Sequence, residues 1–203
     1  DDKIIGDIRS FEGSMYISQL FKKGKGWRYD AKISGGGVII HQTCHLLDLL
    51  NWYLGYPEKV GAIASNWYSK EVEDHAHIIF KYKNNCSGWI DSTWSRHNYR
   101  MLITKIHFEG EDGTLTIDDD SLKLYLTKNK GQYQKGWTEL NKVQLNKGVE
   151  ADFGAPYYSI QNRDFINMVK GESSITGRKH DIYESIRLQE LINKIYSSIN
   201  NKG

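Results

Sequence analysis

Alternation of apolar and polar residues dominates the middle of this 203-residue chain. From residue 60 onward, short runs with a period of two are separated by polar turns such as Lys83-Asn84-Asn85 and Glu111-Asp112-Gly113. This pattern is typical of strands that pair with their sequence neighbours in antiparallel hairpins. Together with an earlier alternating run, it predicts strands at residues 14–20, 60–68, 75–82, 86–94, 101–109, 114–117, 122–126 and 137–143.

Three other segments have apolar residues at helical spacing. The first follows the run Gly35-Gly36-Gly37, is apolar around most of its circumference, and ends where Gly55 and Pro57 stop it. Two more close the chain at residues 157–170 and 182–199, and Asp181 and Glu184 fit a capping box for the last one. Strands and helices in this order predict the α+β class, with a large, mostly antiparallel open sheet and helices packed on one face.

Apolar residues occur at both parities of the predicted strands, so the sheet face without helices would expose an apolar patch. We expect that patch among the residues Ile78, Phe80, Trp89, Ile90 and Trp94. Water-soluble monomers rarely expose such a surface, and we predict that it packs against a second copy of the chain in a homo-oligomer. Coverage by long loops is the alternative.

Few polar residues interrupt the first predicted helix, and His41, His45 and Asp48 stand out among them. Their spacing places them along one helix face. Three interpretations are open: hydrogen bonds within the core, a metal site, or acid/base chemistry by an imidazole whose ordinary pKa lies close to neutrality. The zinc-protease version of two histidines four apart needs a glutamate directly after the first, where this chain has Gln42, and we expect no metal site here.

The segment from Gly35 to Asp48, Gly-Gly-Gly-Val-Ile-Ile-His-Gln-Thr-Cys-His-Leu-Leu-Asp, resembles the start of the C-terminal domain in the Gfo/Idh/MocA oxidoreductases. The resemblance covers nearly the whole chain because further motifs follow in the family's order. These are Gly6-Asp7-Ile8 with Phe11, Trp27-Arg28, Val72-Glu73-Asp74, the hairpin closed by residues 110–115, and residues 158–171 with the terminal helix. It implies the fold of that domain, which is similar to the catalytic domain of glyceraldehyde-3-phosphate dehydrogenase.

The resemblance also implies a two-domain enzyme in which an N-terminal Rossmann domain holds NAD or NADP and a C-terminal domain holds a sugar, nucleotide sugar or polyol. We expect residues 1–203 to be the second domain only, as a single unit. The G-x-G-x-x-G turn of a Rossmann domain is absent, and neither Pro57 nor Pro156 follows the lysine of the family's Glu-Lys-Pro motif. The expected function is therefore the substrate domain of an NAD(P)-dependent dehydrogenase, inactive as an isolated fragment. A non-catalytic binding or oligomerisation module derived from this fold is the alternative.

By resemblance, His45 is the histidine beside the reacting hydroxyl, acting as general base or polarising donor. His41 stands where many relatives have aspartate or asparagine, and we group it with His45 as catalytic. Gln42, next to the helix start, is expected to contact the nicotinamide carboxamide or the substrate.

Four further residues complete the expected site. Trp27 and Arg28 would offer a stacking surface and an anion or hydroxyl contact near nicotinamide and substrate, although a loop-packing indole and an exposed charge fit them equally well. Arg96 and Tyr158 would line the substrate pocket from the far side, and a purely structural role is the favoured alternative for both.

Composition narrows the possible partners. The chain has 27 basic and 25 acidic residues, a net charge of +2, which argues against electrostatic binding of nucleic acid or a membrane surface. It has no apolar run long enough to span a bilayer. Its two cysteines, Cys44 and Cys86, are too few for a disulfide framework, and we expect reduced thiols and a cytoplasmic protein.

Overall fold

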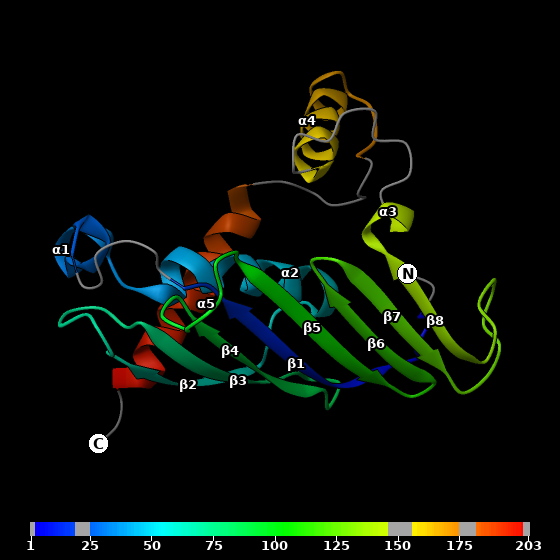
Figure 1. Ribbon diagram of the computed structural model, residues 1–203, viewed down its shortest axis with the longest axis horizontal. Helices are drawn as coiled ribbons and strands as arrows, with labels where there is room; N and C mark the ends of the chain where they lie inside the picture. The colour runs from blue at the N-terminus through cyan, green and yellow to red at the C-terminus, as the bar shows by residue number, and fades with distance from the viewer. Residues whose placement is uncertain (1–2, 19–24, 146–155, 175–181, 201–203) are drawn as a thin grey trace.

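A computed structural model describes residues 3–18, 25–145, 156–174 and 182–200. Its centre is an eight-stranded open sheet with strand order β2-β3-β4-β1-β5-β6-β7-β8 (Figure 1). The strands are β1 Ile8–Tyr16, β2 Lys59–Ser65, β3 His75–Lys81, β4 Ser87–Thr93, β5 Ile103–Gly110, β6 Gly113–Asp118, β7 Ser121–Leu126 and β8 Gly136–Asn141. Neighbouring strands pair antiparallel except β1 and β4, which are parallel. The expected α+β class with a mostly antiparallel open sheet is confirmed.

One strand begins earlier than its sequence pattern indicates. The strand predicted at residues 14–20 is β1 at Ile8–Tyr16, and residues 19 and 20 lie outside the described part. β1 is a central strand that pairs with β4 on one side and β5 on the other over most of its length. Tertiary pairing of this kind extends a strand beyond what local alternation indicates.

Short helical segments precede the main helix, and three helices follow the sheet. They are η1 Trp27–Tyr29, α1 Ala31–Ser34, the π-helical turn η2 Ile39–Thr43, α2 Cys44–Leu54, α3 Lys142–Leu145, α4 Pro156–Val169 and α5 Ile182–Asn200. Helices α2 and α5 lie across one face of the sheet, whereas α4 lies apart from it (Figure 1). The capping residue expected at position 181 lies outside the described residues. Within the described chain, no helix has both the length and the apolar character needed to cross a membrane.

The covered face of the sheet forms the core with α2 and α5. Phe11, Ile78 and Ile90 from the strands and Leu46 and Ile195 from the helices are all almost fully buried. Helix α2 is less enclosed than expected, because Trp52 and Tyr53 are 41% and 46% exposed near its C-terminal end. The prediction of a helix buried around most of its circumference is therefore wrong for its last turn.

The open face carries different apolar residues from those predicted. Ile78, Phe80, Ile90 and Trp94 all point into the core, and of the predicted patch only Trp89 is exposed. The exposed side chains on this face include Ile63, Ile79, Ile103 and Trp137. Alternation identifies the two faces of a strand but not which face the helices cover. Most of the residues predicted to be exposed are therefore buried, and residues of the opposite face are exposed instead.

Candidate active site

The glycine run that leads into the His-bearing segment serves two geometric needs. Gly35 ends α1 in the left-handed region, with φ of 77°. Gly37 has an ordinary φ, but a Cβ atom there would lie 2.0 Å from the carbonyl oxygen of Glu73. The run is therefore required for a turn at Gly35 and for close backbone approach at Gly37.

Glu73 anchors the start of the helical segment. Its buried carboxylate accepts hydrogen bonds from the backbone N–H groups of Gly37 and Ile39 at 3.0 Å and from the Tyr196 hydroxyl at 2.8 Å. A carboxylate at this end of a helix satisfies free N–H groups and complements the helix dipole. Burial, reinforced by the negative charge of Glu73, raises the pKa of Tyr196, so the hydroxyl remains a donor. Glu73 therefore sets the position of the segment relative to α5.

Asp74, the next residue, joins the loop before β3 to the end of β4. One carboxylate oxygen accepts the backbone N–H groups of residues 67–69 at 2.8 to 3.0 Å. The other accepts the indole N–H of Trp94 at 2.9 Å. Asp74 is fully buried, and its effect is to hold the Trp94 ring against the His-bearing segment.

The π-turn at Ile39–Thr43 fastens the segment to the sheet. Gln42, its fourth residue, is buried and donates its side-chain amide to the carbonyl oxygens of Met15 at 2.8 Å and Thr93 at 3.2 Å. The side-chain nitrogen of Gln42 therefore donates to the backbone of the protein itself. The structure thus places Gln42 in the packing between helix and sheet, not in contact with open solvent where a ligand would bind.

His41 lies between two indole rings. Its ring meets Trp27 edge-on at a centroid distance of 5.6 Å and lies nearly parallel to Trp94 at 6.3 Å. Its Nε2 atom is buried and has no hydrogen-bond partner among the described residues. Buried polar atoms are nearly always paired in folded proteins, so this nitrogen is available to a group that completes the site.

His45 has a different environment from His41, although the two are four residues apart. It lies on α2 beyond the π-turn and is exposed to solvent. The two side chains differ in burial, since His41 is half-buried and His45 is exposed. The helix is therefore less enclosed at His45 than expected.

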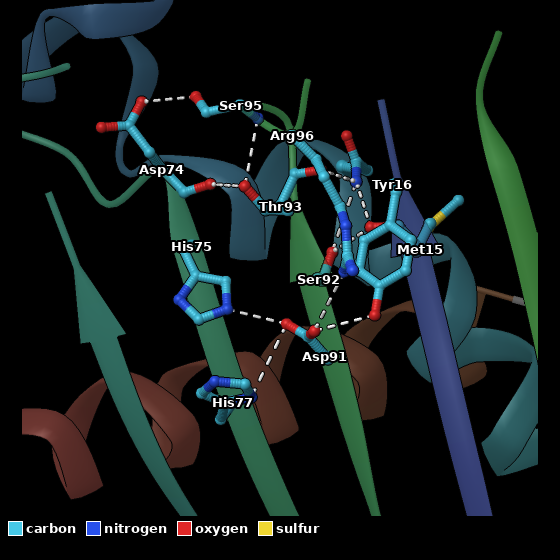
Figure 2. Close-up of polar contacts among 11 residues, drawn as sticks. Met15, Tyr16, Asp74, His75, His77, Asp91, Ser92, Thr93, Ser95 and Arg96 are labelled. Carbon is cyan, nitrogen blue, oxygen red and sulfur yellow. Dashed lines mark hydrogen bonds and ion pairs between the residues drawn. The ribbon is translucent and has the colours of Figure 1, made fainter. Parts of the chain in front are cut away.

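The other expected site residues divide into two groups. Trp27 is 55% exposed, contacts His41, and has the Arg28 guanidinium 5.5 Å from its ring centroid, so these three residues come together. Arg96 instead lies on the open face of the sheet, 4.2 Å from the Tyr16 ring centroid and 3.6 Å from the Asp91 carboxylate (Figure 2). Tyr158 is 67% exposed on α4, which lies apart from the sheet (Figure 1). Arg96 makes its described contacts with Tyr16, Tyr99 and Asp91, and no described contact joins Arg96 or Tyr158 to the His-bearing segment.

Sequence reasoning missed the residues that hold this site together. Trp94 packs on His41 and is held by Asp74, and Glu73 caps the segment that carries both histidines. The available signal was the adjacent pair Glu73-Asp74 at the start of an apolar strand, since two neighbouring carboxylates in such a position need internal partners.

Comparisons with known proteins agree with this architecture. The family model described as GFO/IDH/MocA C-terminal domain matches residues 1–116. The levoglucosan dehydrogenase of Pseudarthrobacter phenanthrenivorans is 21% identical over 146 residues, which cover 58% of this chain and 37% of that protein.

Solved structures show the same fold. A levoglucosan dehydrogenase in complex with NADH matches with a TM-score of 0.80 and 17% identity, over 98% of this chain and 58% of that one. An NAD-binding oxidoreductase from Klebsiella pneumoniae matches with a TM-score of 0.78 and 16% identity, over 99% of this chain and 59% of the other. The chain thus spans between about a third and three fifths of the length of these relatives.

Proposed function

The chain belongs to the GFO/IDH/MocA family through its C-terminal domain, and on that premise we propose that it is the substrate-binding part of a nicotinamide-dependent oxidoreductase. The substrate would be a sugar, nucleotide sugar or polyol with a reacting hydroxyl. Relatives of this fold include a levoglucosan dehydrogenase in complexes with NADH and levoglucosan and with NADH and L-sorbose. Residues 1–203 would act as one domain, and NAD or NADP would be held mainly by a Rossmann domain in the rest of the protein.

The buried Nε2 atom of His41 carries this proposal. It lies in a half-buried ring between two indoles, with no partner among the described residues, where the glycine run brings the chain into the helix. An unpaired nitrogen beside the exposed Trp27 ring is a position at which a polar ligand can gain a hydrogen bond. Trp27 and Arg28 beside it offer an aromatic face and a cation to a polar ligand.

The two histidines would share the work of proton transfer. Bound nicotinamide would supply the hydride chemistry at the carbinol carbon. His45, exposed on α2, would accept the hydroxyl proton during oxidation or donate it during reduction. His41, fixed between Trp27 and Trp94, would use Nε2 to orient the substrate hydroxyl or the charged group next to it.

The test uses the full-length protein and follows nicotinamide absorbance with a panel of sugars, polyols and nucleotide sugars. We expect His45→Ala to lower kcat by about 100-fold or more, as for loss of a general base, and His45→Gln to restore none of it. His107→Ala, on the open face of β5, is the control and should leave turnover unchanged. Unchanged turnover in His45→Ala would remove this residue from the mechanism, and absence of turnover with every substrate class would favour a binding module.

We also propose that a second copy of the chain covers the open face. Ile79 and Trp89 lie opposite each other on β3 and β4, and Ile79 is 63% exposed. Ile79→Lys should lower the mass measured by light scattering to that of a monomer, whereas Ile33→Lys, equally exposed on α1 away from the sheet, should not. A monomeric mass for the unmodified protein at micromolar concentration would contradict this assembly.

A further inference from the structure

Three potential metal ligands meet on the open face, away from the His41 segment. His75 and His77 project from β3, and Asp91 lies on β4 directly opposite His77 in the strand register (Figure 2). His75 Nε2 lies 2.7 Å from Asp91 Oδ1, and His77 Nδ1 lies 3.6 Å from the same oxygen. One ligand atom from each residue falls within 4.8 Å of the other two.

We propose that His75, His77 and Asp91 form a binding site for a divalent transition-metal ion of the zinc class. Two imidazole nitrogens and one carboxylate oxygen are a donor set that suits zinc and similar ions, with the remaining position open to water or another ligand. The site is independent of the proposed oxidoreductase activity, because none of its residues contacts the His41 segment in the described hydrogen bonds and ring contacts.

Two of the three ligand pairs lie close to the spacing of a tetrahedral site, and the His75–His77 pair, within 4.8 Å, would close by up to about 1.4 Å. Ligands about 2.1 Å from a tetrahedral zinc lie roughly 3.4 Å from each other. The His77–Asp91 separation of 3.6 Å already fits this requirement. The His75–Asp91 contact of 2.7 Å would open by less than an ångström as the ion replaces the shared proton.

Neighbouring side chains orient the ligands. The Tyr16 hydroxyl donates to Asp91 Oδ2 at 2.8 Å, which leaves Oδ1 directed to the imidazoles. The Trp67 ring stacks on His75 at a centroid distance of 4.7 Å and fixes that imidazole plane. Outer contacts of this kind tune metal sites in other proteins. In the single chain the His77 side chain is 51% exposed, so an ion can reach it before a second copy covers this face.

A cationic side chain lies beside the Asp91 carboxylate. Arg96 Nη1 lies 3.6 Å from Asp91 Oδ2 and opposes a second positive charge. Removing that arginine should therefore strengthen metal binding, whereas a cluster with a purely structural role would only lose a contact.

The same face offers a matched control. His107 Nε2 lies 3.1 Å from Glu109 Oε1, and His107 Nδ1 lies 2.7 Å from the Thr116 hydroxyl. This pair has one imidazole and one carboxylate, which is one nitrogen ligand fewer than the proposed site. Exposed pairs of this kind are common without a metal.

Isothermal titration of chelator-treated protein with Zn²⁺ tests the proposal, and circular dichroism checks that each variant is folded. We expect saturable binding of one ion per chain, with affinity falling by about 100-fold or more in His77→Ala and in Asp91→Asn. His107→Ala should bind as the unmodified protein does. Arg96→Gln should bind about 3- to 10-fold more tightly, since a neighbouring cation is lost.

Absence of Zn²⁺ uptake by the folded, unmodified protein would overturn the proposal. Uptake that survives in both His77→Ala and Asp91→Asn would also overturn it, because the ion would then bind elsewhere. Neither result bears on nicotinamide turnover, so the two proposals fail separately.

Discussion

The buried carboxylates on the helix side of the sheet and the carboxylate on its open face are satisfied in different ways. Glu73 and Asp74 accept most of their hydrogen bonds from backbone N–H groups, whose positions the fold sets. Asp91 accepts from side chains only in its described contacts, chiefly His75 and Tyr16. A carboxylate held by backbone groups is part of the scaffold, whereas one held by imidazoles and a phenol can exchange those partners for a ligand.

Replacing Asp74 by alanine should cause the largest loss of stability. It would remove the acceptor of the buried Trp94 indole N–H and of three backbone N–H groups, one of them buried and two partly buried. We expect the free energy of unfolding to fall by about 3 to 5 kcal/mol, measured by urea denaturation. A loss below about 1 kcal/mol would show that water replaces the carboxylate and that the scaffold role is wrong.

Gly37→Ala should have the next largest effect, because its Cβ would meet a backbone oxygen that cannot rotate away. The expected loss is about 2 to 4 kcal/mol by the same measurement. Gly61→Ala is the control: its Cβ would lie 3.4 Å from an Ile79 side-chain carbon, an ordinary contact, and stability should change by less than about 1 kcal/mol. Equal effects at the two glycines would contradict the close-approach argument.

Asp91→Asn should have a smaller effect that depends on pH. Because the pKa of Asp91 is lowered in the folded protein, the stability contributed by its ionised form is present at neutral pH and is lost as the pH falls through that lowered pKa. We expect the variant to be about 1 to 2 kcal/mol less stable at neutral pH, and the difference to vanish in strong acid. Denaturation curves across the acid range measure this stability difference. A difference that grows on acidification would contradict a lowered pKa for Asp91 in the folded protein.

His41→Phe should change stability least of the four variants while lowering activity. A phenyl ring can occupy the space between Trp27 and Trp94, and it removes a buried nitrogen that has no described partner. The free energy of unfolding should change by less than about 1 kcal/mol, while kcat of the full-length enzyme should fall by about 10-fold or more. A stability loss above about 2 kcal/mol would show that Nε2 serves the fold instead of a ligand.

Local pattern predicted most of the sheet well. Seven of the strands begin and end within about three residues of their predicted positions, and the largest difference is at β2, which ends at Ser65 instead of residue 68. Alternating burial leaves a period of two in the sequence, which is why these strands could be predicted. The prediction placed the start of β1 six residues too far along the chain, at residue 14 instead of Ile8, and the error has a physical reason. Phe11, Gly13 and Met15 face the core, but the pairing of β1 with two neighbours comes from strands far away in the chain.

Site residues were harder to predict, because proximity across the sheet leaves no local pattern. Trp27, Arg28 and His41 come together, whereas Arg96 lies with Asp91 on the open face. The sequence contained His75, His77 and Asp91 without any spacing that marks a ligand set. Only the register between β3 and β4 places His77 opposite Asp91.

The sequence by itself determined the class of the fold, the order of its elements, and the glycine-led segment that carries His41 and His45. Those properties follow from local periodicity and backbone freedom, which act over a few residues. Only the tertiary structure decided which sheet face is buried, that His41 is half-buried whereas His45 is exposed, and which side chains share a site. These depend on strand register and helix packing, where a shift of one residue reverses every side chain.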